Sequence, residues 1–415
     1  MKLLVPALGA SLAVTAPAVA QYNTPPAAAQ QTVPQNQEQA KEPQIKASSG
    51  ALKAIVELQT AVNANDVANI PARLAAAQKV AKTKEDRYII AQLQLKAALA
   101  TKDNMQIAAA IDAIAASGYV DSAKIGALYR SLGNTFMNAK QYDQAAAALD
   151  KAIAVDPRDP DGLIMLAETR NAQGRKADSV ATFQRVIQAT IASGQKPREE
   201  IYKRAVSLAY EAKLGSAPDL ARQWVAAYPS PDSWRNSIAI YRNLTKPDVE
   251  GTLDLLRLMQ ATGALDSGPD YGLFATAAAD QGNFVEAQAV IDAGIAARQV
   301  DPANPLFRDI MAGLKGKPKT TVADLDAAVK MATTGTALVR IGDRYFGMGQ
   351  YAKAAELYRL AQAKGGSDAD IANLHLGMAL ARAGDKAGAT AAFNAVTGPR
   401  AEIAKYWLLY LQTRA

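Results

Sequence analysis

The sequence predicts an all-α protein built from many short helices. Hydrophobic residues make up 49% of its 415 residues, but aromatic residues only 6%. Alanine-rich runs such as 145–148 and 275–279 suit closely packed helices better than a sandwich of β-branched strands. From Gly50 onward, apolar residues recur three and four positions apart in stretches of about a dozen residues, separated by short turns rich in Gly, Asp, Asn or Pro.

Residues 1–20 have the layout of a cleavable secretory signal peptide. Lys2 precedes a short apolar stretch, which ends in the small-x-small sequence at 18–20. A membrane anchor is the alternative, but Pro6 and Pro17 weaken it. No later stretch reaches the roughly 18 apolar residues that a transmembrane helix needs. We therefore expect an exported chain with no stable membrane insertion after cleavage.

Residues 21–49 are predicted to be a flexible Pro/Gln/Ala-rich linker. The segment contains four prolines and almost no large apolar side chains that could be buried. A spacer between the signal peptide and the folded part explains this composition. A tether or a partner-binding tail is the functional alternative.

The helical pattern continues through the rest of the chain as successive pairs. Each pair holds two amphipathic stretches joined by a short turn, so its two helices are expected to pack antiparallel. The predicted pairs are 50–82, 85–117, 124–155, 160–192, 198–228, 232–262, 269–298, 303–334, 335–364 and 370–396.

Residues 126–159 show the order of side chains within one pair most clearly. Large and small residues follow one another at Tyr129, Leu132, Gly133, Phe136, Ala145, Leu149, Ala152 and Pro157. The small Gly133 and Ala145 allow two helices to approach, the large side chains fill the space between them, and Pro157 ends the second helix. This order resembles the tetratricopeptide repeat. The resemblance implies an α-α superhelix, a solenoid in which each pair stacks on the next because one pair cannot cover its own apolar face.

Further segments resemble the same repeat. They are 160–193, 268–301, 335–368 and 370–403. Residues 50–120 and 198–262 keep the helix pairing without the small-residue signature. We therefore predict an N-terminal helical-repeat region, 50–262, and a C-terminal repeat region, 263–415.

The final residues, 404–415, are predicted to form a capping helix over the last repeat. Trp407, Tyr410 and Leu411 fall at the packing positions of one more first helix. An exposed aromatic patch that binds a partner is the alternative.

The composition excludes several classes of site. There is no cysteine, so disulfides and thiolate metal sites are excluded. His375 is the single histidine, too few for the usual zinc or di-iron ligand sets, and we expect it to be a surface or groove residue. The formal net charge is +7, with scattered rather than clustered Lys and Arg, so we expect no nucleic-acid partner.

Two segments resemble known ligand-binding motifs, but the spacing of their residues does not match those motifs. In 312–321, Pro318 stands where a phosphate-binding loop needs a hydroxyl residue. In 156–162, the aspartates do not follow the spacing of a calcium loop. With no recognisable catalytic constellation, the sequence predicts neither enzymatic activity nor a cofactor.

The tetratricopeptide resemblance implies that the first helix of each repeat lines a concave groove. In 126–159 this face carries Arg130, Asn134 and Met137. Arg130 and Asn134 resemble part of the carboxylate clamp that some family members use for C-terminal peptides. The next repeat departs from the clamp, with Met165 where an asparagine is expected.

A second stretch of the predicted groove carries Asp343, Phe346, Leu374 and Met378. It is more apolar and suits an amphipathic helix or an extended hydrophobic segment of a partner. Burial of these side chains by neighbouring repeats is the alternative.

The sequence therefore predicts a periplasmic scaffold or adaptor that binds proteins or peptides non-covalently, with envelope biogenesis as its setting. The alternative is a peptidoglycan- or glycan-associated binding module that would use Trp224, Tyr228, Trp234 and Tyr241 as aromatic platforms. The identity of the partner and the oligomeric state stay open at this point.

Overall fold

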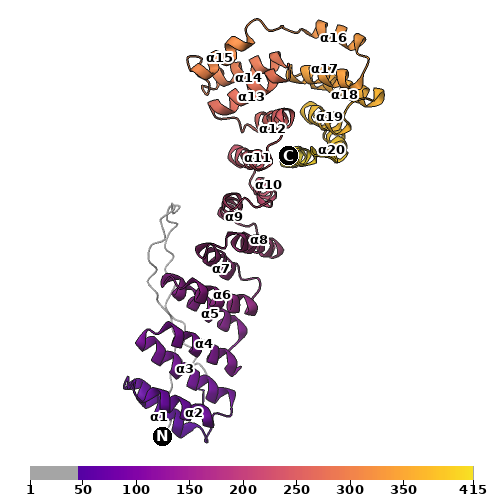
Figure 1. Ribbon diagram of the computed structural model, residues 1–415. Helices are drawn as coiled ribbons and strands as arrows, with labels where there is room; N and C mark the ends of the chain where they lie inside the picture. Colours follow the sequence, from indigo (N-terminus) through magenta and orange to yellow (C-terminus); the bar gives the residue numbers. More distant parts are fainter. Residues whose placement is uncertain (1–44, 415) are drawn as a thin grey trace, which may run out of the picture. The chain divides into compact units, whose positions relative to one another are not determined.

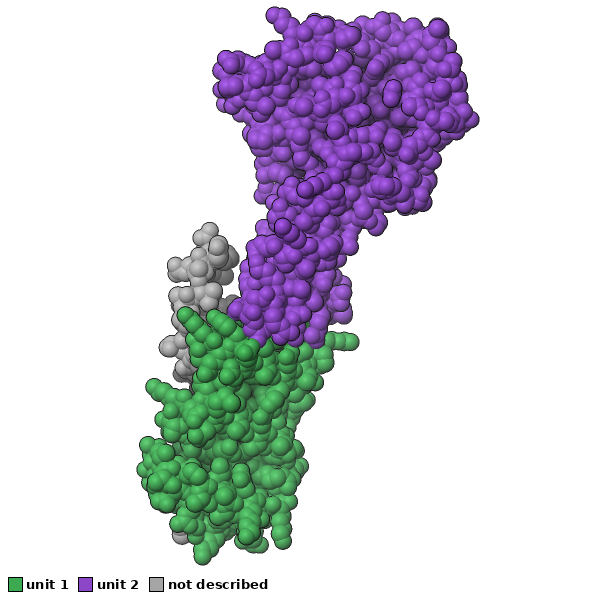
Figure 2. Space-filling view, in the orientation of Figure 1, with its two compact units in different colours: residues 1–169 green, residues 170–415 purple. Residues whose placement is uncertain are grey.

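The structure, a computed structural model, describes residues 45–414, and all regular secondary structure in this range is α-helical (Figure 1). The predicted signal peptide, 1–20, and most of the linker, 21–49, lie outside the described residues. No helix of the described range is long and apolar enough to cross a membrane. The chain divides into two compact units at Thr169 and Arg170, coloured separately in Figure 2.

Unit 1 is built from consecutive helix pairs, α1 with α2, α3 with α4 and α5 with α6, each of which contacts the next pair (Figure 1). Its helices are α1 (Leu52–Asn63), α2 (Ile70–Val80), α3 (Lys84–Thr101), α4 (Asn104–Ser117), α5 (Ser122–Asn138) and α6 (Tyr142–Val155). The division between the units falls inside α7 (Pro160–Ala172). The pairs lie where the apolar periodicity predicts them.

The folded part of unit 1 begins before Gly50. Ile45 and Ala47, which the composition assigns to the linker, pack against the first hydrophobic core. The backbone N–H of Ser48 donates to Oδ1 of Asp86 at 2.7 Å, and its hydroxyl donates to Oδ2 at 2.8 Å. Asp86 also closes the capping box of α3 with Thr83. The last residues of the predicted linker are therefore attached to α3.

Small residues hold the helices of a pair close together, as the repeat pattern predicts. A Cβ atom placed on Gly133 would lie 2.6 Å from Cγ of Leu149 on the partner helix. A Cβ atom on Gly377 would lie 2.5 Å from the ring of Phe393. Since even a methyl group does not fit at these separations, glycine at both positions sets the interhelical distance.

Unit 2 contains the remaining helices. Its helices are α8 (Lys176–Ala192), α9 (Glu199–Glu211), α10 (Ala217–Ala227), α11 (Pro231–Thr245), α12 (Val249–Thr262), α13 (Gly268–Asp280), α14 (Phe284–Ala296), α15 (Pro305–Leu314), α16 (Val322–Met331), α17 (Gly335–Gly347), α18 (Tyr351–Lys364), α19 (Ala369–Ala383), α20 (Lys386–Asn394) and α21 (Ala401–Thr413). The predicted pair 303–334 is wrong: α15 packs on α13 and α14, whereas α16 packs on α17, because each of these helices covers its apolar face against a different neighbour.

Helix α21 does more than cover the last repeat. It packs on α20, as a capping helix would, and also on α10, α12 and α19. The hydroxyl of Tyr406 donates to the backbone carbonyl of Ser237 at 3.0 Å, across 169 positions of sequence. Trp407 is fully buried and stacks on Phe393, and Tyr410 is buried too, so these aromatic residues form no exposed patch. Unit 2 is therefore closed by contacts between its C-terminal helices and α10 to α12.

This closure explains where the division of the chain lies. Contacts from α21 tie α10 and α12 to the C-terminal repeats, so 198–262 belongs to the same compact unit as 263–415. The sequence-based division at 262/263 differs from this one, because the repeat pattern shows packing between neighbours only. Helix α12 is buried around most of its circumference, including Asp254 and Arg257.

Candidate functional site

Helix α5 presents three of the residues predicted to bind a partner. Its N-terminus is capped by Asp121, whose Oδ1 accepts from the backbone N–H of Lys124 at 2.9 Å. Arg130, Asn134 and Met137 then follow at helical spacing on one face, which we call the α5 face. Asn134 is exposed, and Met137 is half-buried against the core of unit 1. The structure thus brings these three side chains together.

The guanidinium of Arg130 is held in place by an ion pair. Its Nη1 lies 2.5 Å from Oδ2 of Asp159, and the two side chains are 35% and 14% exposed. Oδ1 of Asp159 also accepts from the backbone N–H of Asp161 at 3.2 Å, so the aspartate acts as a turn residue before α7. The α5 face therefore combines a fixed cation with a free-standing amide and a soft apolar side chain, a set that can bind a peptide carboxylate or carbonyl.

The second predicted stretch of the groove is part of the hydrophobic core of unit 2. Leu374 and Met378 are 0% exposed, and Phe346 is buried as well. All three belong to the hydrophobic core of unit 2, together with apolar residues of α12. The ring of Phe346 also lies 4.8 Å from the guanidinium carbon of Arg257. These side chains are therefore buried rather than exposed in a groove, which is the alternative given above. The space that an open groove would need is occupied by α12 and the helices around it.

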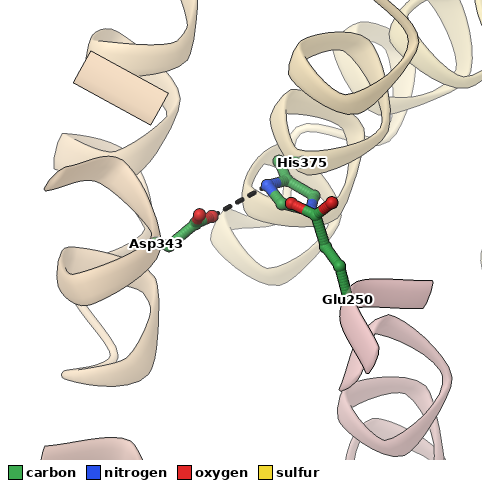
Figure 3. A group of neighbouring side chains, drawn as sticks. All are labelled: Glu250, Asp343 and His375. Atoms are coloured by element: carbon green, nitrogen blue, oxygen red, sulfur yellow. Dashed lines mark ion pairs between the residues drawn. The ribbon is translucent and has the colours of Figure 1, made fainter. Parts of the chain in front are cut away.

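His375 is not a surface residue. It is 2% exposed on α19 and lies between two carboxylates. Nδ1 is 2.8 Å from Oδ1 of Asp343, as Figure 3 shows, and Nε2 is 3.2 Å from Oδ1 of Asp254. Burial lowers the pKa of His375, but the two carboxylates outweigh it and raise this pKa to about 10. The expectation of a surface histidine fails because both partners come from other helices far away in the sequence.

Further residues hold these carboxylates. The hydroxyl of Tyr358 donates to Oδ1 of Asp343 at 2.7 Å. Nη2 of Arg400 donates to Oε2 of Glu250 at 2.9 Å. Burial raises the pKa of Asp343, but His375, Arg257 and the hydrogen bond from Tyr358 outweigh it, so this pKa stays below its usual range. We call the whole group the charge cluster; it comprises Glu250, Asp254, Arg257, Glu286, Asp343, His375 and Arg400.

Three members of the charge cluster offer ligand atoms for a metal ion. One atom each of Glu250, Asp343 and His375 lies within 4.8 Å of the other two. Figure 3 shows the three side chains converging from separate helices. Sequence reasoning excluded a metal by counting histidines and cysteines, and no spacing in the sequence indicates that α12, α17 and α19 meet.

The aromatic residues of the glycan alternative are not open platforms. Trp234 and Tyr241 are buried in the core of unit 2. Trp224 and Tyr228 line a cavity of about 450 Å³, but Trp224 is itself almost fully buried, and its Nε1 donates to Glu199. Nζ of Lys196 lies 3.8 Å from the ring centroid of Tyr228, and Nζ of Lys203 lies 5.6 Å from that of Trp224. The ring faces are thus covered by lysines of the same chain rather than free for a sugar.

Comparison with known proteins places these repeats in a family. The family model described as Tetratricopeptide repeat matches residues 130–194 and 339–402. No curated protein sequence matches the chain. Solved structures with 12% sequence identity do match, one of them a tetratricopeptide repeat protein from Parabacteroides merdae, with a TM-score of 0.26 over 78% of this chain and 99% of that one.

Two other solved structures show similarly distant matches. PilF of Pseudomonas aeruginosa is 12% identical, with a TM-score of 0.22 over 71% of this chain and 99% of its own. A structure of Naa15/Naa10 bound to HypK-THB is 12% identical, with a TM-score of 0.33 over 85% of this chain and 58% of the matched one. The matches at 130–194 and 339–402, where glycines bring the two helices of a pair together, show that the chain contains tetratricopeptide repeats in these two segments.

Proposed function

We propose that the chain is a scaffold or adaptor that binds a protein or peptide segment through the α5 face. Repeats of this family serve as scaffolds for protein–protein interaction. This surface is favoured because its side chains are accessible to a partner. Of the residues predicted to bind, Asn134 is exposed and Arg130 half-buried, whereas Leu374 and Met378 are core residues.

The chemistry of the α5 face suggests a partner segment with an acidic or C-terminal carboxylate beside an apolar side chain. Arg130 is already held by Asp159, so it needs little ordering when a carboxylate approaches. The amide of Asn134 can donate to a peptide carbonyl and accept from a peptide N–H. Met137 offers a flexible apolar contact for a neighbouring side chain.

We further propose that the protein works in the periplasm, in envelope biogenesis. The signal-like layout of residues 1–20 supports this location. Fractionation of cells that produce the full chain, with mass spectrometry of its N-terminus, tests it. The expected product lacks about the first 20 residues and is released with the periplasmic fraction; an intact N-terminus in the cytoplasmic fraction would contradict the location.

Site-specific crosslinking in living cells tests the binding surface. A photo-crosslinking residue at Asn134 is expected to capture a discrete partner, and Ala147, exposed on α6 of the same pair, is the matched control position. Arg130→Ala combined with Asn134→Ala should abolish binding of the captured partner to the purified chain while leaving its helicity unchanged. Equal capture from both positions, or undiminished binding by the double variant, would remove the α5 face as the binding site.

A further inference from the structure

We propose that Glu250, Asp343 and His375 bind a divalent transition-metal cation in the interior of unit 2. This site is separate from the α5 face and independent of the proposed scaffold function. It lies where α12, α17 and α19 meet (Figure 3). Three features of the protein support it: the orientation of the imidazole, the contacts that hold the two carboxylates, and the charge that the cluster leaves unbalanced.

The imidazole of His375 is oriented by Asp254. Nε2 lies 3.2 and 3.4 Å from the two carboxylate oxygens of this fully buried aspartate, which favours the proton on Nε2. Nδ1 is buried and makes no directed hydrogen bond, although Oδ1 of Asp343 is only 2.8 Å away. A nitrogen lone pair facing a carboxylate at this distance is repelled unless a proton or a metal cation lies between the two atoms, so a metal ion would take the place that a proton fills in the metal-free protein. Histidine ligands of metals share this arrangement, with the second ring nitrogen bound to a carboxylate.

Each carboxylate is also fixed by a residue outside the proposed ligand set. Tyr358 donates to Oδ1 of Asp343, and Arg400 donates to Oε2 of Glu250. Oε1 of Glu250 receives no contact from Arg400 and can turn toward an ion, and Oδ1 of Asp343, which faces Nδ1 of His375, keeps a lone pair for one beside the hydrogen bond from Tyr358. Ligating carboxylates in metal sites are hydrogen-bonded in the same way, which holds them in position before the metal arrives.

The charge cluster carries excess negative charge, by one unit when the imidazole is protonated and by two when a metal ion takes the place of the Nδ1 proton. Its two cations are the guanidiniums of Arg257 and Arg400, and its anions are the carboxylates of Glu250, Asp254, Glu286 and Asp343. A protonated imidazole thus leaves one negative charge unbalanced in a largely buried place, and a neutral, metal-binding imidazole leaves two, which is strongly unfavourable without a further cation. One divalent cation balances them.

The ligand types select the class of cation. One imidazole nitrogen and two carboxylate oxygens suit Zn²⁺ or Mn²⁺, whereas Ca²⁺ and Mg²⁺ take oxygen ligands alone. The ligand atoms come from three helices of unit 2, so bound metal would tie α12 to α17 and α19. The expected role is therefore to hold unit 2 closed.

Metal binding by the full chain without an affinity tag provides the test. The sequence has no cysteine and no other histidine, so background binding of Zn²⁺ is low. Titration calorimetry is expected to show one equivalent of Zn²⁺ and no comparable binding of Mg²⁺. Tyr358→Phe should weaken Zn²⁺ binding by about 10- to 100-fold, and His375→Gln should abolish it. Asp292→Asn, an exposed carboxylate on α14, is the control and should bind as the wild type does.

Nuclear magnetic resonance of the single imidazole decides the question even where a variant fails to fold. In the wild-type chain, saturating Zn²⁺ is expected to shift the Nδ1 resonance of His375 to that of a metal-bound nitrogen and to leave Nε2 protonated. A histidine that keeps both ring protons in the presence of Zn²⁺ would overturn the proposal, because a proton then occupies the place of the metal. Stoichiometric Zn²⁺ binding by folded His375→Gln would overturn it too.

Discussion

Arg257 and Glu286 form a two-point ion pair inside unit 2. Nε of the arginine lies 2.9 Å from Oε1 of the glutamate, and Nη2 lies 2.8 Å from Oε2. The two side chains are 2% and 7% exposed. The pair joins α12 to α14, and the same guanidinium reaches Asp254, so the charge cluster is continuous across these helices.

The first prediction concerns this pair. Glu286→Gln keeps the size of the side chain but leaves the guanidinium of Arg257 without its main counter-charge, which is expected to cost about 3–5 kcal/mol. All three tryptophans of the chain lie in unit 2, so urea unfolding followed by tryptophan fluorescence reports on this unit. Glu356→Gln removes an exposed pair with Lys353 and serves as the control, with a change within about 0.5 kcal/mol. Equal midpoints for the two variants would contradict the prediction.

A second prediction compares one substitution at two glycines of unit 2. Gly377→Ala should destabilise the unit by about 1–3 kcal/mol, because its Cβ would lie 2.5 Å from the ring of buried Phe393. Gly313→Ala, in α15, meets nothing within 4 Å. There the helix propensity of alanine acts alone, and stability should rise by up to about 1 kcal/mol. The urea midpoints should therefore move in opposite directions, and movement in the same direction would refute the argument from close approach.

A third prediction is a pH dependence at the start of unit 1. Burial raises the pKa of Asp86, but hydrogen bonds from Ser48, Thr83 and Lys82 outweigh it and lower this pKa from its usual 3.8 to about 2. Because the folded-state pKa is the lower one, the stabilisation is complete above the usual pKa and is lost as the pH falls toward 2. At about 1.4 kcal/mol per pKa unit, the loss is about 2 kcal/mol.

Hydrogen exchange of α1, corrected for intrinsic rates, is the measurement. The wild-type chain should lose protection of this helix between pH 5 and pH 2, and Asp86→Asn should show weak protection throughout with little pH dependence. Equal pH profiles in the two proteins would show that Asp86 does not attach the start of the chain to α3.

The fourth prediction concerns the closure of unit 2 by α21. Tyr406→Phe removes a buried hydroxyl that contacts both Oγ and the backbone carbonyl of Ser237. Leaving the serine hydroxyl without this partner should cost about 1–3 kcal/mol in the urea unfolding of unit 2. The control is Tyr210→Phe, an exposed tyrosine whose hydroxyl accepts from Asn243. If Tyr406→Phe lowered the stability of unit 2 by no more than the control does, the Tyr406 contact would add nothing to closure.

Most of the helix pairs are predictable from the sequence because the determinants of a pair are local. The apolar periodicity places both helices, and glycines such as Gly133 and Gly377 mark the close approach within a pair. The same logic predicts the α5 face, since Arg130, Asn134 and Met137 follow from helical spacing alone.

The site residues of unit 2 are not predictable in this way. Leu374 and Met378 occupy groove positions of their repeat, but their burial depends on α12 and α21, which the repeat pattern does not place. The surroundings of His375 depend on Asp254, 121 positions earlier. A pattern that repeats between neighbours contains no information about contacts at such separations.

The closure by α21 also has a consequence for the order in which the chain folds. Arg400 pairs with Asp248 and Glu250, which precede it by 152 and 150 positions. At about 5–20 residues per second, a ribosome needs roughly 8–30 s to make the intervening chain. The helix pairs of unit 1 can form as they emerge, because they contact their neighbours. Helix α12 must wait for α19 and α21, so unit 2 is expected to complete its folding later than unit 1.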